Sequence, residues 1–541
     1  MFKEAKIPMS REEKLFRYTP VWKTLLLMAI PSMALMLIFG LYTFMDNVLA
    51  INLADYDAKT IGERTYERKD LVRLFMSGIS PVITFMFAIT MLFGVGVSRR
   101  YSINLGAGRE ERAKQTIKTT MQIALGVSLV LIPVLIFASK PWIKSQYSGE
   151  PEMANLISDK GFDYVWIIIM AFPMQMFNQI VSSLLRAEAK NKQVLISQLF
   201  PILINLLMDW ILMGPCGMGI EGGAWATFIS YLLTTIILSF YMLTLKTTRI
   251  KFKNFIGFHG FKAITIIGVI LVGISPFMRN MAQSITQTIE TRTMQEVSQN
   301  VYGNKMQMNL VMSAVFPIFG LFFPMLFGFV QAASPIIGYN YGAGDIKRVK
   351  QATWYVVLYS TIVAVMIYII STFLLMDYLN KILGVQNQLL KGGVMFHTLD
   401  KTQKMYGIMM FGAIVFGPSL GAMALFGSTD RIMFSIFASL LRGLLLLIPF
   451  LFIFKAITDT INYDTAQNLS GENGIFSKEY IFWWFYPALS ITTSITLLST
   501  LIYTLKHLDK KRTTLEERIS KIYLNQKNRK NKKLAKEDQL K

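Results

Sequence analysis

Residues 102–116 read SINLGAGREERAKQT, and residues 337–353 read IGYNYGAGDIKRVKQAT. The same Gly-Ala-Gly turn, followed by a basic, helix-forming run, therefore recurs about 236 residues further along the chain. Each copy follows one long apolar segment and precedes another, as expected of a hairpin between two membrane helices. Glycine permits the tight turn, and the lysines and arginines after it hold the loop on the positive side of a membrane. The repeat predicts two similar membrane halves.

The composition is that of a polytopic membrane protein. Of the 541 residues, 53% are hydrophobic and 16% are charged, and the mean hydropathy is +0.43. A segment needs about 20 apolar residues to cross the hydrocarbon core of a bilayer. Twelve such segments are predicted, with no soluble domain left over: roughly 21–45, 75–98, 117–139, 161–185, 194–214, 224–245, 261–289, 309–334, 351–376, 405–427, 432–456 and 480–505.

The net charge of +22 has a positional explanation. Lysine and arginine are more frequent in the amino-terminal arm, the even-numbered loops and the tail than in the odd-numbered loops. This is the positive-inside bias, and it predicts a multi-pass protein of the cell membrane with both termini in the cytoplasm. The basic tail is interpreted as an orientation signal near anionic lipid, and no nucleic-acid partner is expected. A single cysteine, Cys216, excludes a disulfide framework and a cysteine-based metal site.

Corresponding stretches of the two halves are separated by nearly the same number of residues. Pro276 corresponds to Pro31 at about 245 residues, and the turn LFGSTDR after the tenth segment corresponds to LLRAEAKNK after the fourth at about 240. Six crossings are an even number, so the second half enters the membrane from the same side as the first. The predicted fold is an all-α polytopic membrane protein, with twelve transmembrane helices in two parallel six-helix repeats around a central cavity.

The predicted organisation has five parts. They are a cytoplasmic amphipathic arm (1–20), an amino-terminal six-helix lobe (21–246), a cytoplasmic interlobe linker (247–260), a carboxy-terminal six-helix lobe (261–505) and a basic cytoplasmic tail (506–541).

Two carboxylates stand out near helix depth, Asp46 and Asp209, and both lie in the first half. A charged side chain at the bilayer centre costs about 2.5–3.5 kcal/mol on insertion scales, so each is a candidate functional group. Asn205 precedes Asp209 by four residues, and the two therefore share one helix face. Such a face can exchange protons, or it can hold a sodium ion with other oxygens. The alternatives are that Asp209 only bonds a neighbouring helix and that Asp46 lies at headgroup level.

Several stretches together resemble the MATE (multidrug and toxic compound extrusion) transporters across about residues 20–505. They are the twin turns, IPSMALMLIFGLYTFMDNVLA at 30–50, LLRAEAKNK at 184–192 and GIEGGAWATFIS at 219–230. The resemblance is to the DinF-like prokaryotic branch. It implies a cation site in the amino-terminal lobe and a hinge at the first-helix proline, Pro31. The residues that match the pattern of the cation site are Asp46, Asn205, Asp209, Thr227 and, by spacing alone, Tyr164.

The NorM-like branch of the same family expects a glutamate on the seventh helix, shortly after its proline. Here residues 279–290 read RNMAQSITQTIE, which places Ser284 near that position and Glu290 too late. A sodium site in the carboxy-terminal lobe is therefore not expected.

The resemblance implies a cation-coupled multidrug efflux transporter, a proton or sodium antiporter that exports amphipathic, cationic compounds by alternating access. It would act as a monomer in the lipid bilayer on a small-molecule substrate. H⁺ or Na⁺ would be the coupling ion, with no other cofactor or metal. The expected sodium ligands, if sodium is the ion, come from Asp46, Asn205, Asp209 and Thr227.

Polar residues of the second half are candidates for the substrate cavity: Arg279, Asn280, Gln283 and Gln331. The alternative is that the amides only form hydrogen bonds between helices. Arg279 and Arg442 do not fit a cationic substrate, and they favour a second hypothesis, a flippase of the same superfamily for a lipid-linked anionic precursor. Against the flippase, these arginines are only two and no helices are predicted beyond twelve.

Other classes are less consistent with the sequence. The major facilitator fold also has two parallel six-helix halves, but GAGREERAKQ lacks the aspartate of its loop signature. The three histidines, His259, His397 and His507, fall in loops or at helix ends, and no Gly-rich nucleotide loop ending in Lys-Ser/Thr is present. We therefore predict neither an enzyme nor an ATP-driven transporter.

Overall fold

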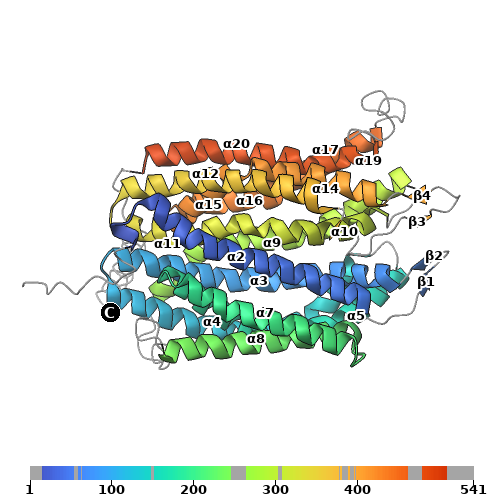
Figure 1. The fold of residues 1–541 in the computed structure, drawn as a ribbon, viewed down its shortest axis with the longest axis horizontal. Helices are drawn as coiled ribbons and strands as arrows, with labels where there is room; N and C mark the ends of the chain where they lie inside the picture. Colours follow the sequence, from blue (N-terminus) through green and yellow to red (C-terminus); the bar gives the residue numbers. More distant parts are fainter. Residues whose placement is uncertain are drawn as a thin grey trace, which may run out of the picture.

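The computed structural model describes residues 15–53, 59–61, 64–66, 68–147, 151–244, 263–302, 307–376, 378–379, 388–389, 395–396, 398–429, 431–460 and 478–508. The described residues form a bundle of long, roughly parallel and antiparallel helices, with two short hairpins at one end (Figure 1). The predicted linker 247–260, most of the arm and tail, and His259 and His397 lie outside the described residues.

The amino-terminal lobe comprises α2 (Val21–Leu53), the antiparallel strands β1 (Lys59–Ile61) and β2 (Arg64–Tyr66), α3 (Arg68–Gly106), α4 (Glu110–Ser145), α5 (Pro151–Met170), α6 (Phe172–Ala187), α7 (Asn191–Met213) and α8 (Gly219–Thr244). The first part of the carboxy-terminal lobe comprises α9 (Ala263–Tyr302), α10 (Gln307–Phe322), α11 (Pro324–Gly342), α12 (Ile346–Ile369) and the π-helix η2 (Ile370–Leu375).

The rest of that lobe comprises the antiparallel strands β3 (Gln388–Leu389) and β4 (Met395–Phe396), α14 (Thr398–Ile414), α15 (Gly417–Ser428), α16 (Ile432–Leu440), the π-helix η3 (Leu441–Leu446), α17 (Leu447–Thr460), α19 (Lys478–Ile481), the 3₁₀-helix η4 (Phe482–Trp484) and α20 (Phe485–Lys506).

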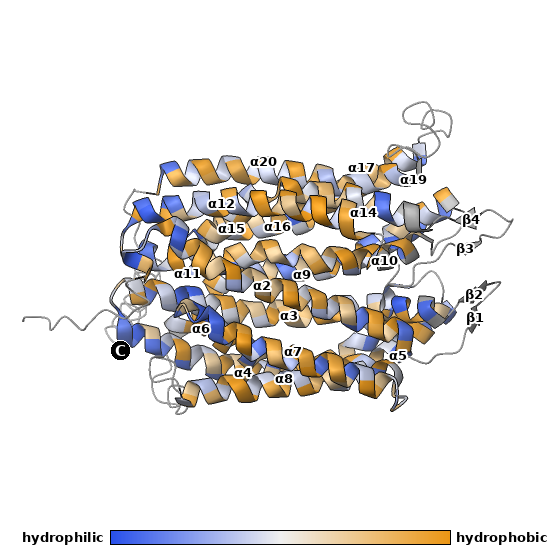
Figure 2. Ribbon diagram, in the orientation of Figure 1, coloured by the Kyte–Doolittle hydropathy of each residue, from blue (hydrophilic) through white to orange (hydrophobic). Residues whose placement is uncertain are grey.

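The helices have the length and hydropathy of membrane spans. Within the described residues, ten helices pass this test, and the number is twelve if each of two bent helix pairs is one span. Figure 2 shows apolar residues along the middle of the bundle and polar residues at its two ends. The prediction of an all-helical membrane fold with twelve spans is therefore confirmed. Some helices are much longer than their predicted apolar segments. α3 has 39 residues and α9 has 40.

The two bent pairs occupy equivalent places in the repeat. α5 and α6 meet at 52°, and α14 and α15 meet at 51°. Pro173 and Pro418 lie in the first turn of α6 and of α15, where a missing N–H is tolerated and where the preceding helix has to end. The predicted spans 161–185 and 405–427 are therefore each two helices rather than one, and the equal bends show that both halves repeat the same device.

The lobes pack together through α3 against α9 and α2 against α11, two helix pairs that the repeat makes equivalent. The lobes also approach each other closely at the twin turns. A methyl group at Gly106 would overlap the carbonyl oxygen of Tyr339, and one at Gly342 would overlap that of Ile103. Because Ile103 and Tyr339 are themselves repeat mates, the contact is reciprocal, as a pseudo-twofold axis requires.

Both turns end their helices in the same way. Gly108 and Gly344 have φ of +72° and +82°, a conformation that favours glycine. The N–H of the residue that follows donates to a carbonyl five residues earlier, at 2.8 Å in the first turn and 2.9 Å in the second. This is the Schellman pattern, which satisfies carbonyls left open at a helix end. The twin motif is thus a structural corner in each lobe.

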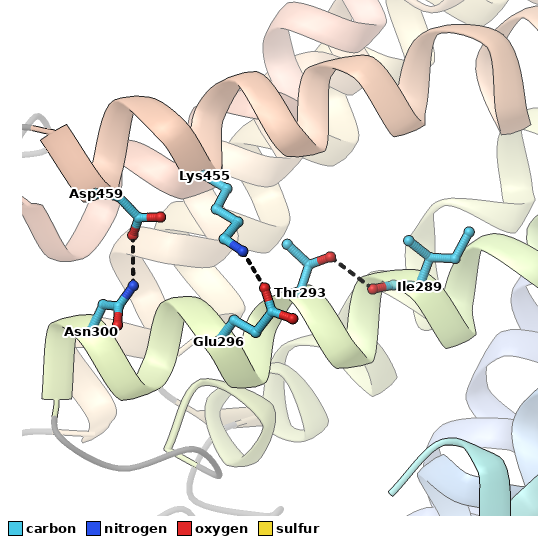
Figure 3. Close-up of polar contacts among 6 residues, drawn as sticks. All are labelled: Ile289, Thr293, Glu296, Asn300, Lys455 and Asp459. Atoms are coloured by element: carbon cyan, nitrogen blue, oxygen red, sulfur yellow. Dashed lines mark hydrogen bonds and ion pairs between the residues drawn. The ribbon is translucent and has the colours of Figure 1, made fainter. Parts of the chain in front are cut away.

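At the opposite end of the bundle, α9 and α17 are joined by two side-chain contacts (Figure 3). Lys455 forms an ion pair with Glu296, and the Asn300 amide donates to the Asp459 carboxylate at 2.9 Å. On each helix the two participating residues are four positions apart and therefore share one face.

Candidate functional site

The two carboxylates predicted from the sequence lie together inside the amino-terminal lobe. Asp46 on α2 is 7% exposed and Asp209 on α7 is fully buried. Their charges are close enough to interact. Asp46 is therefore enclosed by protein and does not lie on the outer surface of its helix. Two buried like charges repel each other, so the pair favours a proton or a metal cation between or beside them.

Five polar atoms at this place have no hydrogen-bond partner among the described residues. They are Oδ1 of Asp46, both carboxylate oxygens of Asp209, and both amide atoms of Asn205, which is one helical turn before Asp209. A buried polar atom without a partner costs about 1–3 kcal/mol. Such atoms are few in native proteins, and several in one place point to a ligand that satisfies them.

Tyr164 and Thr227 complete the predicted set. The hydroxyls of Tyr42 and Thr227 are 3.3 Å apart, and Tyr164 interacts with Thr227 and with both carboxylates. Gly223 lies between Asp209 and Tyr164, because a Cβ atom at this glycine would be 3.7 Å from Asp209 Oδ1 and 3.8 Å from Tyr164 Cε2. The structure thus brings all five predicted residues together, and their role in ion binding stays a prediction.

Sequence reasoning missed two tyrosines of this site. Tyr42 lies four residues before Asp46 on α2, and Tyr231 lies four residues after Thr227 on α8. Both are near enough to Asp46 for an electrostatic interaction, and the Tyr231 hydroxyl accepts a hydrogen bond from Gln175 at 3.3 Å. The helical spacing of four residues is the signal that could have found them.

The site offers carboxylate, amide and hydroxyl oxygens, which are the ligands of hard cations. Among the described residues, no group of three or more His, Cys, Asp or Glu side chains could hold a metal ion. If Na⁺ binds, the oxygens of Asp46, Asn205, Asp209 and Thr227 are those available to hold it. The same carboxylates could instead carry a proton.

The proposed hinge lies on α2, where Pro31 cannot donate a backbone hydrogen bond. One turn earlier, the Met28 carbonyl accepts hydrogen bonds from the Ser32 hydroxyl and the Asn191 amide, both at 2.9 Å. Asn191 is the first residue of α7, the helix that carries Asp209. Next to Pro31, α2 is therefore hydrogen-bonded to α7, the helix that carries Asp209 of the candidate ion site.

The four residues predicted to line a substrate cavity form no side-chain hydrogen bond with one another in the described part of the chain: Arg279, Asn280, Gln283 and Gln331. The Asn280 amide donates to a carbonyl of its own helix at 2.8 Å. The Gln283 side chain is exposed, and the Gln331 amide contacts a methionine sulfur of α2 at 3.5 Å. Arg279 differs from the other three because its guanidinium lies on an aromatic ring, with Cζ 4.9 Å from the centroid of Phe327.

That Glu290 comes too late for the NorM-like position stays a prediction. Its carboxylate is enclosed within the carboxy-terminal lobe, which the hydropathy pattern did not indicate. Glu290 is 7% exposed and accepts a hydrogen bond from the Tyr486 hydroxyl at 2.7 Å. The reason is the length of α9, which continues to Tyr302, about three turns beyond Glu290. Unlike the Asp209 oxygens, one oxygen of this carboxylate is satisfied within the protein.

Comparison with known proteins gives consistent results. The MatE family model matches residues 76–211 and 311–453, one region in each lobe. An uncharacterized MG447 homolog of Mycoplasmoides gallisepticum is 25% identical over 459 residues, which cover 79% of this chain and 74% of that protein. The MG447 homolog of Mycoplasma pneumoniae, also uncharacterized, is 22% identical over 498 residues, which cover 82% of this chain and 87% of that protein.

Two solved structures share the fold. A MOP superfamily transporter from Pyrococcus furiosus, whose structural report names a reversed polarity of its binding pocket, matches with a TM-score of 0.74 and 17% identity. An outward-facing multidrug resistance MATE family transporter of the same superfamily matches with a TM-score of 0.73 and 16% identity. Each match covers 93% of this chain and all of the other. Since the family model covers more than half of the sequence, the chain belongs to the MatE family of membrane transporters.

Proposed function

We propose that this protein is a cation-coupled antiporter of the DinF-like branch, which exports amphipathic compounds across the cell membrane by alternating access. Inward movement of a proton or a sodium ion through Asp46 and Asp209 would supply the driving force. The observation that supports the proposal is the group of five unpartnered polar atoms on Asp46, Asn205 and Asp209. A buried set of acceptors that the protein leaves open is what a reversibly bound cation needs.

The contacts around the site suggest how ion binding reaches the rest of the lobe. A bound cation would draw α2 and α7 together at Asp46 and Asp209. The two helices are also tied at Met28 and Asn191, beside Pro31. If the distance between α2 and α7 changed at the ion site, α2 would therefore bend at Pro31. The helix is weakest there because proline has no N–H and one backbone hydrogen bond of the helix is missing. Both termini would face the cytoplasm, and the protein would work as a monomer.

The test is transport in proteoliposomes, driven separately by a proton gradient and by a sodium gradient. The resemblance implies a cationic substrate, so ethidium and norfloxacin are followed first, and dodecyl phosphate is followed beside them as an anionic amphiphile. We expect Asp209→Asn and Asp46→Asn to reduce gradient-driven transport to the background of empty liposomes. The matched control is Asp159→Asn in the same lobe, an exposed carboxylate that pairs with Lys140 at 2.6 Å. Unchanged transport by Asp209→Asn would contradict the coupling role.

A second candidate function is the flipping of a lipid-linked anionic precursor. One observation favours it. Arg279 and Arg442 form no ion pair with any carboxylate in the part of the chain that the structure describes. A flippase would move a labelled phospholipid or lipid phosphate between leaflets of the proteoliposome, whereas an exporter of soluble compounds would not.

A further inference from the structure

Two arginines of the carboxy-terminal lobe lie on one cluster of three phenylalanine rings. The rings of Phe323, Phe327 and Phe416 are in mutual contact, with centroids 5.4–6.1 Å apart. Arg279 of α9 has its Cζ atom 4.9 Å from the centroid of Phe327. Arg442 of η3 has its Cζ atom 4.5 Å from Phe416 and 5.8 Å from Phe323. The rings orient both guanidinium groups by cation–π contact and give the site a large apolar surface.

Both guanidinium groups have only neutral partners among the described residues. Arg279 contacts the Met423 sulfur at 3.7 Å, and Arg442 donates to the Ser490 hydroxyl at 3.1 Å. The nearby carboxylate, Glu290, is held by the Tyr486 hydroxyl and forms no ion pair with either arginine. Both arginines are half-buried. An arginine carries five N–H donors, and these contacts use few of them.

A third arginine approaches the cluster from the other lobe. Arg99 of α3 is 6% exposed, and its Nε and Nη1 atoms have no hydrogen-bond partner among the described residues. Its guanidinium packs on the backbone of Gly427, and its charge lies close enough to that of Arg279 to interact. Three like charges, none of which forms an ion pair with a carboxylate among the described residues, create a positive potential at a place shared by the two lobes.

We infer that Arg99, Arg279 and Arg442, together with the three phenylalanines, form a binding site for an anionic group on an apolar body, a phosphate or carboxylate amphiphile. Guanidinium groups bind such anions with paired, charge-assisted hydrogen bonds, and the rings pack against the apolar part. A cationic compound would meet three like charges here. The inference rests on the proposed transport function and names the class of its substrate as anionic.

The test is binding to the purified protein without any ion gradient. Three amphiphiles share a twelve-carbon chain and differ in head group: dodecyl phosphate, dodecyltrimethylammonium and the neutral dodecyl maltoside. We expect dodecyl phosphate to bind at least tenfold more tightly than the other two, and Arg279→Gln or Arg442→Gln to weaken it about tenfold each. Arg442→Lys should restore part of the loss, because it keeps the charge without the planar fork. Lys455→Gln, with the same loss of charge at the far end of α17, should bind as the unmodified protein does.

The source of the anion is separated by two further probes, dioleoyl phosphatidic acid in nanodiscs and inorganic phosphate. Tighter binding of the lipid than of dodecyl phosphate would assign the site to a lipid headgroup, and the reverse order would assign it to a soluble amphiphile. Inorganic phosphate that competes as well as dodecyl phosphate would overturn the role of the rings. Equal binding of all three head groups, or arginine variants that fold and bind normally, would overturn the site. Because binding is measured without an ion gradient, a failed coupling mechanism would show as unchanged transport by Asp209→Asn, whereas a failed anion site would show as unchanged dodecyl phosphate binding by the arginine variants, and the two failures are distinguishable.

Discussion

The two lobes repeat one fold and carry opposite charges at equivalent helices. In the amino-terminal lobe, α2 and α7 bring Asp46 and Asp209 together, with carboxylate, amide and hydroxyl oxygens around them. In the carboxy-terminal lobe, the equivalent helices are α9 and the span that contains η3, and they carry Arg279 and Arg442. Under the proposed function and the inferred anion site, one lobe would offer acceptors to a cation and the other would offer donors to an anion.

This difference shows which parts of the repeat are free to diverge. The turns, the bends of 52° and 51° and the contacts of Gly106 and Gly342 are alike in both lobes because they fix the backbone. The charged side chains inside the lobes do not fix the backbone, and the two lobes carry them with opposite sign and at different positions of the equivalent helices. In a transporter that binds an ion and a substrate, two sites of opposite charge can be occupied separately.

The largest effect is expected from reversing the charge of the carboxy-terminal lobe. The double variant Arg279→Glu/Arg442→Glu should bind dodecyltrimethylammonium instead of dodecyl phosphate. The ratio of the two affinities should change by about three orders of magnitude, because each charge-assisted hydrogen bond contributes about 1.5–3 kcal/mol. Both affinities are measured by equilibrium dialysis.

The control for this variant is Lys455→Glu, which reverses a charge on α17 away from the rings. Binding of the coupling ion at Asp46 and Asp209 should persist in the double variant, and this retained binding would show that the double variant is folded. A folded double variant with an unaltered ratio of affinities would contradict the assignment of opposite roles to the two lobes.

The next effect concerns Asn205, whose amide has no partner at all among the described residues. Asn205→Leu keeps the volume and removes both polar atoms. The concentration of coupling ion for half-maximal transport should rise about 10- to 100-fold, because a ligand is lost. The thermal stability should stay equal or rise, because no hydrogen bond is broken and two buried polar atoms are removed.

A matched asparagine separates the two effects. Asn178 in the same lobe is also buried, but its amide donates to the Tyr231 carbonyl at 2.9 Å and accepts from the Thr235 hydroxyl at 3.0 Å. Asn178→Leu should therefore lower the free energy of unfolding by about 1–3 kcal/mol. If Asn205→Leu destabilised the protein as much as Asn178→Leu, Asn205 would be a structural residue and not an ion ligand.

A third prediction tests what the lobes share. Gly106→Ala and Gly342→Ala should each lower the free energy of unfolding by about 1–2 kcal/mol, since a methyl group meets a backbone carbonyl that cannot move aside alone. The two losses should be equal within error, as measured by thermal unfolding in detergent. Gly126→Ala on α4 is the control, because open space surrounds that position and alanine favours a helix. Unequal losses for the two turn glycines would show that the contact is not symmetric.

The fold was predictable because its signals are local. Helix ends with Gly108 and Gly344 are specified by a few neighbouring residues, and membrane spans by runs of apolar residues. The carboxylates of the candidate site were predictable because charges are rare inside membrane helices. Two of the tyrosines around them were missed, although each lies four residues from a predicted site residue, because an uncharged side chain in a membrane helix does not stand out as a carboxylate does.

Other features depend on geometry that the sequence does not reveal. The burial of Glu290 was not foreseen, because α9 continues beyond its apolar segment to Tyr302. The breaks at Pro173 and Pro418 were missed because a proline in a membrane helix can also be tolerated as a mild kink. The ring cluster under Arg279 and Arg442 joins residues from the breaks of two spans, which no spacing along the chain predicts.

The smallest effect is expected for the side-chain contacts that join the first span of each lobe to its fifth span. In the amino-terminal lobe, Asn191 does so through a buried hydrogen bond to the Met28 carbonyl, and Asn191→Ala should lower the free energy of unfolding by about 1–3 kcal/mol. In the carboxy-terminal lobe, Lys455 and Glu296 do so through an ion pair whose glutamate is 60% exposed (Figure 3). Lys455→Ala should lower the free energy of unfolding by no more than about 1 kcal/mol.

Salt separates these two links. In thermal unfolding at 1 M salt, where charges are screened over about 3 Å, the loss caused by Lys455→Ala should vanish while that of Asn191→Ala persists. A buried link next to Pro31 would then hold the ion-binding lobe in register, and a screened surface link would leave α9 and α17 free to adjust around a ligand at Arg279 and Arg442. A loss for Lys455→Ala that survives high salt would contradict this division, because the carboxy-terminal lobe would be tied as firmly as the other.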